Sequence, residues 1–292
     1  MKFDSRAIAV SIALLVAGCG GGGGGGGGGD TSPPAQNPPV VVDTATFAGT
    51  RNDFSIARAG SGYTVTDKRT NAVTNVGSTI TTLRFTDITI NLTVGSKAAT
   101  MGSAGVNALV DLYIASLSRV PDADSLASLI TRHSAGTTMA QIADELYAQA
   151  VVHPALTGYS SAMTKTSDFV EAVYKNAFGR TGATAPTAGD VATWSARIDT
   201  DGITRGALIL DMVNSARSGS GTLGGDATVV SLLNNKLTVG KYFAIEQGIN
   251  YNSRDDSRNW RTSISLAVTS SDTTAAITLI NMTDTSFNLT AN

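Results

Sequence analysis

Apolar and polar residues alternate with a period of two between residues 44 and 97, which indicates strands with one buried face. A glycine-containing loop interrupts the first part of the alternation, as in a hairpin. The apolar positions are Phe54, Ile56, Tyr63, Val65, Leu83, Phe85, Ile88, Ile90 and Leu92. We expect 44–97 to form a small antiparallel β segment. Because so small a sheet is marginal alone, its apolar face is expected to pack against the rest of the protein.

After the short connection Gly95–Lys97, the apolar spacing changes to three and four residues, which is typical of amphipathic helices. The predicted helices span 104–118, 122–134, 138–151, 166–178, 188–199, 203–216, 226–248, 256–268 and 272–282. The expected caps are Asp122 or Asp124 for the second helix, Thr137 for the third, Thr166 or Ser167 for the fourth and Asp272 for the last. The predicted fold class is therefore α+β and mostly α.

Part of the helical region occurs twice. The matching segments are 108–119 with 169–180, 125–129 with 191–194, and 142–150 with 208–216. Both copies of the first segment place a tyrosine six residues before an arginine, as Tyr113/Arg119 and Tyr174/Arg180. We predict that 98–292 is a helical repeat domain with two copies of a roughly three-helix unit plus C-terminal helices, since two stacked units bury an apolar face that one cannot.

The N-terminal residues indicate export. Residues 1–18 combine a basic start with the apolar run Ala7–Ala17, which is too short to span a bilayer but suits a signal peptide. The ending LVAGC resembles the bacterial lipoprotein signal, in which the thiol of the cysteine, here Cys19, takes a diacylglycerol. Glycine rather than aspartate follows Cys19, which by the same resemblance favours the outer membrane, on its periplasmic side or at the cell surface. An ordinary secretory peptide with an incidental cysteine is the alternative.

Residues 19–43 are predicted to form a flexible tether. Ten consecutive glycines occupy 20–29, and the proline-rich stretch TSPPAQNPP follows them. A glycine-rich chain of this length behaves as a random coil with an end-to-end span of roughly 25–30 Å, and prolines extend it. The tether is therefore expected to hold the folded part away from a membrane.

The amino-acid composition limits the classes of binding partner that we expect. The net charge is −2 and only 15% of residues are charged, so nothing favours a nucleic acid or an acidic lipid surface. Cys19 is the single cysteine, so the chain has no disulfide pair and must be stabilised by packing.

The repeat carries a family resemblance. LYIASLSRVPDADSLASLI and VYKNAFGR followed by VATWSARI resemble the helical repeat of a bacterial family named domain of unknown function 4214, which occurs in exported and surface proteins. DFSIARAGSGYTVTD followed by LRFTD resembles a β segment often found beside such domains. The first copy departs from the family pattern, with Ser118 in place of glycine and Leu129 in place of tryptophan. A fainter resemblance to the phycobilisome linker domain implies an assembly role, and neither resemblance implies an activity.

Candidate chemistry is sparse. The chain has no nucleophile-elbow or zinc-helix motif, so we expect no catalytic residues, although acidic residues that meet in space can hydrolyse glycosides. Asp122, Asp124, Asp199 and Asp201 are weak calcium candidates, because an EF-hand loop that starts at Asp199 lacks its later ligands. Beyond the diacylglycerol on Cys19 and this weak calcium possibility, no cofactor is expected.

Six side chains are candidates for contact with a ligand or partner. They are Tyr113, Arg119, Tyr174, Arg180, Trp194 and Trp260. The Tyr–Arg pairs are either structural or line a shared groove. Trp194 and Trp260, with Tyr159, Tyr242 and Tyr251, form either part of the core or a platform on which sugars stack.

These observations predict a non-enzymatic lipoprotein of the cell envelope that serves as a surface interaction or assembly module. Stacked helical repeats present extended surfaces that suit partners rather than deep pockets. The expected partner is another envelope protein or a polysaccharide. The alternative is an envelope enzyme that acts on glycans.

The lipid anchor generates the first prediction. Cys19→Ser removes the thiol that would receive the diacylglycerol, so the precursor is expected to stay unprocessed or the protein to leave the membrane fraction. Cell fractionation with immunoblotting measures both, and globomycin treatment of the unaltered protein should give the same precursor. Unchanged processing together with unchanged membrane attachment would show that Cys19 is incidental.

Overall fold

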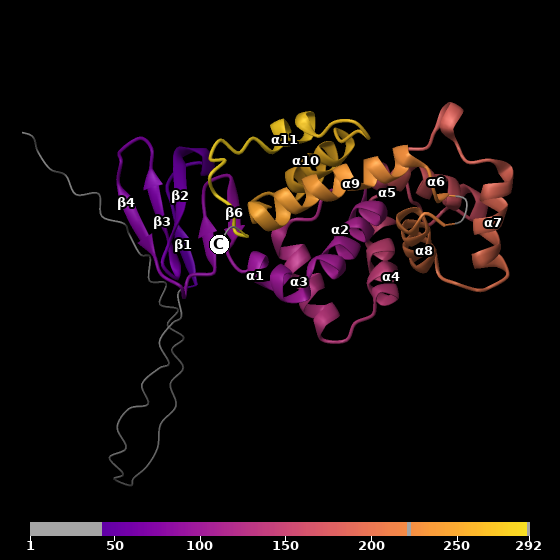
Figure 1. Cartoon of the computed structure of the whole chain (residues 1–292), viewed down its shortest axis with the longest axis horizontal. Coiled ribbons are helices and arrows are strands. Elements are labelled where there is room, and N and C mark those ends of the chain that lie inside the picture. Colours follow the sequence, from indigo (N-terminus) through magenta and orange to yellow (C-terminus); the bar gives the residue numbers. More distant parts are fainter. Residues whose placement is uncertain (1–42, 221–222, 291–292) are drawn as a thin grey trace, which may run out of the picture. The chain divides into compact units, whose positions relative to one another are not determined.

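A computed structural model describes residues 43–220 and 223–290 of the protein (Figure 1). Within this part, the fold is α+β and mostly helical, as predicted. The predicted signal peptide, Cys19 and all of the predicted tether except Asp43 lie outside the described residues. No helix in the described part is both long and apolar enough to cross a membrane.

The described helices follow the predicted series closely. They are α1 (Val94–Met101), α2 (Ser103–Leu117), α3 (Ala123–Ser134), α4 (Met139–Ala150), α5 (Pro154–Thr157), α6 (Thr166–Phe178), α7 (Ala188–Asp199), α8 (Arg205–Ser218), α9 (Ala227–Lys241), α10 (Arg254–Leu266) and α11 (Thr274–Ile280). Short helices of other types are η1 (Arg51–Asp53), η2 (Gly182–Thr184) and the π-helix η4 (Tyr242–Glu246). The connection expected at Gly95–Lys97 is instead the start of α1. Gly95 packs closely there, since a Cβ atom would lie 3.0 Å from the Leu289 carbonyl oxygen.

The strands are β1 (Thr44–Thr46), β2 (Phe54–Ala59), β3 (Gly62–Asp67), β4 (Val73–Val76), β5 (Thr82–Arg84), β6 (Ile88–Asn91) and β7 (Ile249–Tyr251). They form two sheets rather than the single antiparallel one expected. The sheet β2-β3-β4 is antiparallel, whereas β1-β5-β6-β7 is mixed because β1 runs parallel to β5. Both predicted hairpins are present, with Ile56 opposite Val65 and Leu83 opposite Ile90.

The β segment is not confined to 44–97, because β7 pairs with β6 from the far end of the chain. The predicted helix 226–248 stops early, since α9 passes into the π-helix η4 and Gly248 then takes a positive φ of 63°. A Cβ at Gly248 would lie 2.8 Å from the Asn91 carbonyl oxygen, so the close approach of β7 to β6 requires glycine. Three residues are too few for an alternation to reveal β7 in the sequence.

The two predicted helical units are α2-α3-α4 and α6-α7-α8. The first helix of each ends in a left-handed residue, Ser118 (φ 54°) or Gly179 (φ 65°), so the serine adopts the conformation that glycine has in the second copy. Asp122 caps α3 as expected, by accepting from the Ser125 N–H at 2.7 Å. The cap of α4 is Thr138 rather than Thr137, and α6 begins after Lys165 with no side-chain cap.

Polar contacts join the two helical units. The Asp111 carboxylate on α2 accepts two hydrogen bonds of 2.7 Å from Arg217 on α8. Burial raises the pKa of Asp111, although Arg217 opposes the rise. Lys236 on α9 donates to the carbonyls of Asn176 (3.0 Å) and Ala177 (3.3 Å) near the end of α6, and burial lowers the pKa of its amine to about 8. These contacts hold α2, α6, α8 and α9 together.

The inner faces of both sheets belong to one hydrophobic core with the helices. The nine apolar residues predicted to form the inner face are buried, except that Tyr63 and Leu92 are partly buried. Phe85 lies at the junction of the sheets, with its ring centroid 5.2 Å from that of Phe47 and 5.3 Å from that of Phe54. The described residues form a single compact unit.

Arg51 is fully buried between the strands and the C-terminal segment. Its Nη1 donates to the Phe54 carbonyl at 2.8 Å, and its Nη2 pairs with Asp284 at 3.1 Å. The guanidinium also lies 5.9 Å from the ring centre of Phe85 and 5.3 Å from that of Phe287. Figure 1 shows the segment after α11, in yellow, returning to the strands where these contacts form.

Phe85→Ala is expected to destabilise sheets and helices together, by about 3–5 kcal/mol, because it removes a ring on which both sheets and Arg51 pack. Chemical denaturation followed by far-ultraviolet circular dichroism and by tryptophan fluorescence should show one shifted transition. Val152→Ala changes a side chain that is 68% exposed and should alter stability little. Loss of sheet signal at a lower denaturant concentration than loss of helix signal would contradict the single core.

Asp284→Asn is expected to lower stability at neutral pH by about 3 kcal/mol, because it leaves the buried Arg51 charge without its partner. Burial alone would raise the pKa of Asp284, but hydrogen bonds from Ser286, the Ile56 N–H and Arg51 hold it below its usual value. The folded state thus binds a proton less readily than the unfolded state, so this contribution is present above the unfolded pKa and is lost as pH falls through the folded pKa.

Denaturant midpoints measured across acid pH test this reasoning, since the Asp284→Asn protein should lose less stability on acidification than the unaltered one. Asp201→Asn, which removes an exposed carboxylate, is the matched control and should keep the original acid slope. Identical slopes for all three proteins would show that the pKa of Asp284 is the same in the folded and unfolded states.

Candidate functional site

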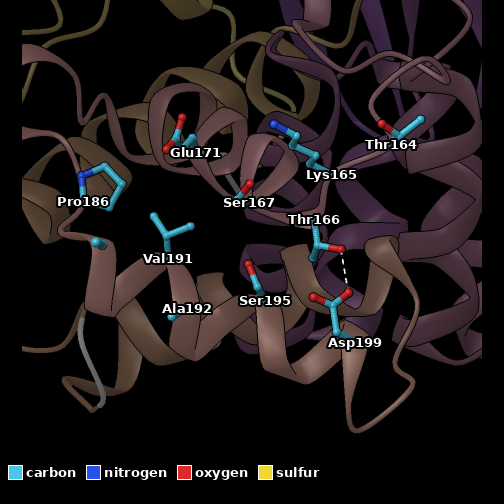
Figure 2. A pocket seen from close by; sticks show the side chains of 11 residues that line it. Thr164, Lys165, Thr166, Ser167, Glu171, Pro186, Val191, Ala192, Ser195 and Asp199 are labelled. Atoms are coloured by element: carbon cyan, nitrogen blue, oxygen red, sulfur yellow. Dashed lines mark hydrogen bonds between the residues drawn. The ribbon is translucent and has the colours of Figure 1, made fainter.

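Two concave surfaces stand out in the described part of the chain. The first, here called the α6–α7 cleft, has a volume of about 820 Å³ and lies between the start of α6 and the face of α7 (Figure 2). Its lining residues are Thr164, Lys165, Thr166, Ser167, Glu171, Pro186, Ala188, Val191, Ala192, Ser195 and Asp199. Polar groups predominate among them, and no aromatic side chain lines the cleft.

The polar groups of the α6–α7 cleft are held by few protein contacts. Thr166 Oγ1 donates to Asp199 Oδ1 at 2.7 Å, the hydrogen bond drawn in Figure 2. The Ser195 Oγ atom is buried and has no hydrogen-bond partner in the described part. Glu171 and Asp199 are both exposed.

The second surface, here called the Trp260 groove, has a volume of about 340 Å³. It brings together η1, the start of β6, β7, α10 and the end of α11. Its lining residues are Asn52, Asp87, Ile88, Tyr251, Trp260, Thr278, Leu279, Ile280, Asn281 and Met282. These residues are far apart in the sequence, so the groove exists only in the folded chain.

Two aromatic residues line the Trp260 groove. Trp260 on α10 is 47% exposed, which is unusual for so large an apolar side chain. Tyr251 on β7 is partly buried, and its ring centroid lies 5.6 Å from that of Phe243. Burial raises the pKa of Tyr251 to about 12, so its hydroxyl keeps its proton at physiological pH. The groove thus has an apolar plate beside a neutral hydroxyl.

The polar side of the Trp260 groove is fixed by backbone contacts. Asp87 Oδ1 accepts from the N–H groups of Arg51 (2.9 Å) and Ile88 (3.0 Å). The Asn52 amide donates to the Asn281 carbonyl at 2.7 Å and accepts from the Thr283 N–H at 3.1 Å. These bonds hold the end of α11 against η1, so the polar side of the groove is set in place by the protein.

The Tyr–Arg pairs of the repeat do not form a shared groove. Tyr113 is buried, and its hydroxyl accepts from Arg261 at 3.0 Å. Tyr174 is also buried, and its hydroxyl accepts from Trp194 Nε1 at 3.2 Å. Both tyrosines and Trp194 therefore lie in the core and make their contacts within the protein.

The two arginines of the repeat differ. Arg119 is buried, and its Nε and Nη1 have no hydrogen-bond partner in the described part. Arg180 is partly exposed, with Nη1 bound to Asp226 at 2.9 Å and Nε bound to the Thr184 carbonyl. Trp260 is thus the only exposed residue of the six ligand-contact candidates.

The four aspartates considered for calcium have protein partners. Asp122 pairs with Arg261 at 2.8 Å, and Asp124 accepts from Asn91 at 2.7 Å. Asp199 accepts from Thr166, as above, and Asp201 pairs with Arg197 at 3.0 Å. Within the described residues, no group of three or more acidic, histidine or cysteine side chains is placed to hold a metal ion.

No known protein family, curated protein or solved structure matches the chain. The resemblances to family 4214 and to the phycobilisome linker domain therefore stay predictions. Asn52 and Asp87 were missed as site residues, because both belong to turns whose sequence gives no sign that α10 and α11 lie beside them. Of the proposed aromatic platform, Trp260 and Tyr251 share one groove, whereas Tyr159 is fully buried.

Proposed function

We propose that the protein is a non-enzymatic, lipid-anchored module of the cell envelope, attached to the outer membrane, that binds another envelope protein or a polysaccharide. The observation that carries this proposal is the half-exposed Trp260, which lines a groove together with Tyr251 and with fixed polar groups. Exposed aromatic residues next to hydrogen-bonding groups are typical of recognition surfaces, because they supply a large contact area with little loss of conformational freedom.

The sequence supports the same proposal from the other end of the chain. The tether between Cys19 and the described residues would let the folded part turn toward a partner while the lipid stays in the membrane. Binding at the groove and attachment through Cys19 would then place the protein between a membrane and a second envelope component.

The α6–α7 cleft favours a second candidate, an envelope enzyme that acts on glycans. Glu171 and Asp199 both line this cleft, and glycoside hydrolysis uses two carboxyl groups. Their exposure to solvent is the reason that we rank binding above catalysis, since enzymes commonly exclude water from their reacting groups.

Binding is tested with the chain from residue 19 onward carrying Cys19→Ser, because the predicted signal peptide and the lipid would themselves partition into membranes. The protein should sediment with envelope fragments, and Trp260→Ala should weaken sedimentation about tenfold or more. Leu266→Ala, which removes a 73% exposed apolar side chain from the same helix, should leave binding unchanged. Protease or periodate treatment of the fragments shows whether protein or polysaccharide is bound.

No sedimentation of the Cys19→Ser chain, or equal sedimentation of the Trp260→Ala protein, would reject the proposal. The release of reducing sugar ends, measured in the same mixtures, tests the alternative that the protein is an enzyme that acts on glycans. The glycan enzyme would be favoured instead if Glu171→Gln and Asp199→Asn abolished the release of reducing ends while Trp260→Ala left it unchanged.

A further inference from the structure

We infer that the Trp260 groove binds a segment of an uncharged polysaccharide, with one sugar ring stacked on Trp260. This inference rests on the proposed function and names the chemical class of its partner. The argument depends on the groove's charge, its apolar surface and the hydrogen-bonding groups around it.

The charge of the groove selects against acidic polymers. Asp87 is the only charged side chain among the described residues that line it. Its carboxylate would repel uronic acids, sulfates and phosphates at close range, and no lysine or arginine of the lining compensates. The same carboxylate accepts hydrogen bonds from hydroxyl groups, which an uncharged sugar offers around its ring.

The apolar surface of the groove has the form of a plate. Trp260 is 47% exposed, whereas Ile88 and Ile280, which also line the groove, are only 1% and 2% exposed. These two isoleucines therefore offer little surface to a ligand, and the exposed indole supplies much of the apolar contact. A pyranose ring presents a face of C–H groups that matches such a plate, with hydroxyl groups at its rim.

A protein partner fits these features less well. Protein interfaces draw most of their binding energy from anchor side chains that enter deep, desolvated pockets. Ile88 and Ile280 offer an anchor side chain little apolar surface, because they are already packed in the core. A sugar, by contrast, needs a plate and fixed polar groups, which Trp260, Tyr251 and Asp87 provide.

The polar groups stand in fixed positions, which favours sugar binding further. Asp87 Oδ1 is held by two backbone N–H groups, and its Oδ2 makes no hydrogen bond in the described part of the protein. Tyr251 keeps its hydroxyl proton because burial raises its pKa to about 12. Preformed donors and acceptors of this kind reduce the entropy lost when a ligand binds.

The experiment uses the chain from residue 19 onward with Cys19→Ser and Trp194→Phe, which leaves Trp260 as the single tryptophan. Chitotetraose and cellotetraose should shift or quench its fluorescence in a saturable way, with dissociation constants of about 1 mM or tighter. Polygalacturonate and heparin fragments of similar length should bind at least about tenfold more weakly. Titration calorimetry of chains that keep Trp194 then compares the groove variants.

Trp260→Ala should abolish binding of the uncharged oligosaccharides, and Trp260→Phe should retain part of it, since phenylalanine keeps a smaller ring. Leu266→Ala should bind like the parent protein. Asp87→Asn keeps the oxygen that accepts from the N–H groups of Arg51 and Ile88 but loses the negative charge. It should therefore reduce the difference in affinity between uncharged and acidic oligosaccharides. Circular dichroism confirms that each variant is folded.

Saturable binding of the uncharged oligosaccharides that Trp260→Ala removes would support the inference. Tighter binding of the acidic oligosaccharides would overturn it. It would also be overturned if neither uncharged probe bound while the Cys19→Ser chain still sedimented with envelope fragments through Trp260. That result would leave the proposed function standing with a protein partner, whereas failure to sediment at all would reject the proposed function itself.

Discussion

The ion pair between Arg51 and Asp284 is the contact on which the β part of the protein depends. It joins residues 233 positions apart in the chain, and both side chains are almost fully buried. Asp284 also accepts from the N–H of Ile56 at 2.9 Å, which satisfies a donor on the edge strand β2. Without the C-terminal segment, the sheet would keep an unpaired buried charge and an open edge, and each is costly.

The same contact determines the geometry of the Trp260 groove. The residue after Arg51 is Asn52, which ties η1 to the end of α11, and the Arg51 N–H holds Asp87. The polar side of the groove is thus built on the backbone around Arg51, while β7 and α10 supply its aromatic side. Hydrogen bonds hold the short segments that carry Asn52 and Asp87, and strands and helices supply the rest, which makes the groove a preformed surface.

Most of the fold could be predicted from the sequence, because its signals are local. The apolar spacing and caps indicated nearly every longer helix, and the αL residue at Ser118 or Gly179 ends the first helix of each repeat. The second sheet could not be predicted, since β7 is stabilised by pairing with a distant strand. The site was predictable only in part. Trp260 was a candidate by its residue type, whereas Asp87 gains its role from long-range packing that leaves no local pattern.

The separation of Arg51 from Asp284 along the chain has a consequence for folding. The two residues that pair are 233 positions apart, so the strands around Arg51 are synthesised well before Asp284. Contacts across so long a loop form late, because the loop must close before the contact stabilises it. Until that loop closes, Arg51 lacks the carboxylate that pairs with it, and the Ile56 N–H on the edge strand lacks its acceptor.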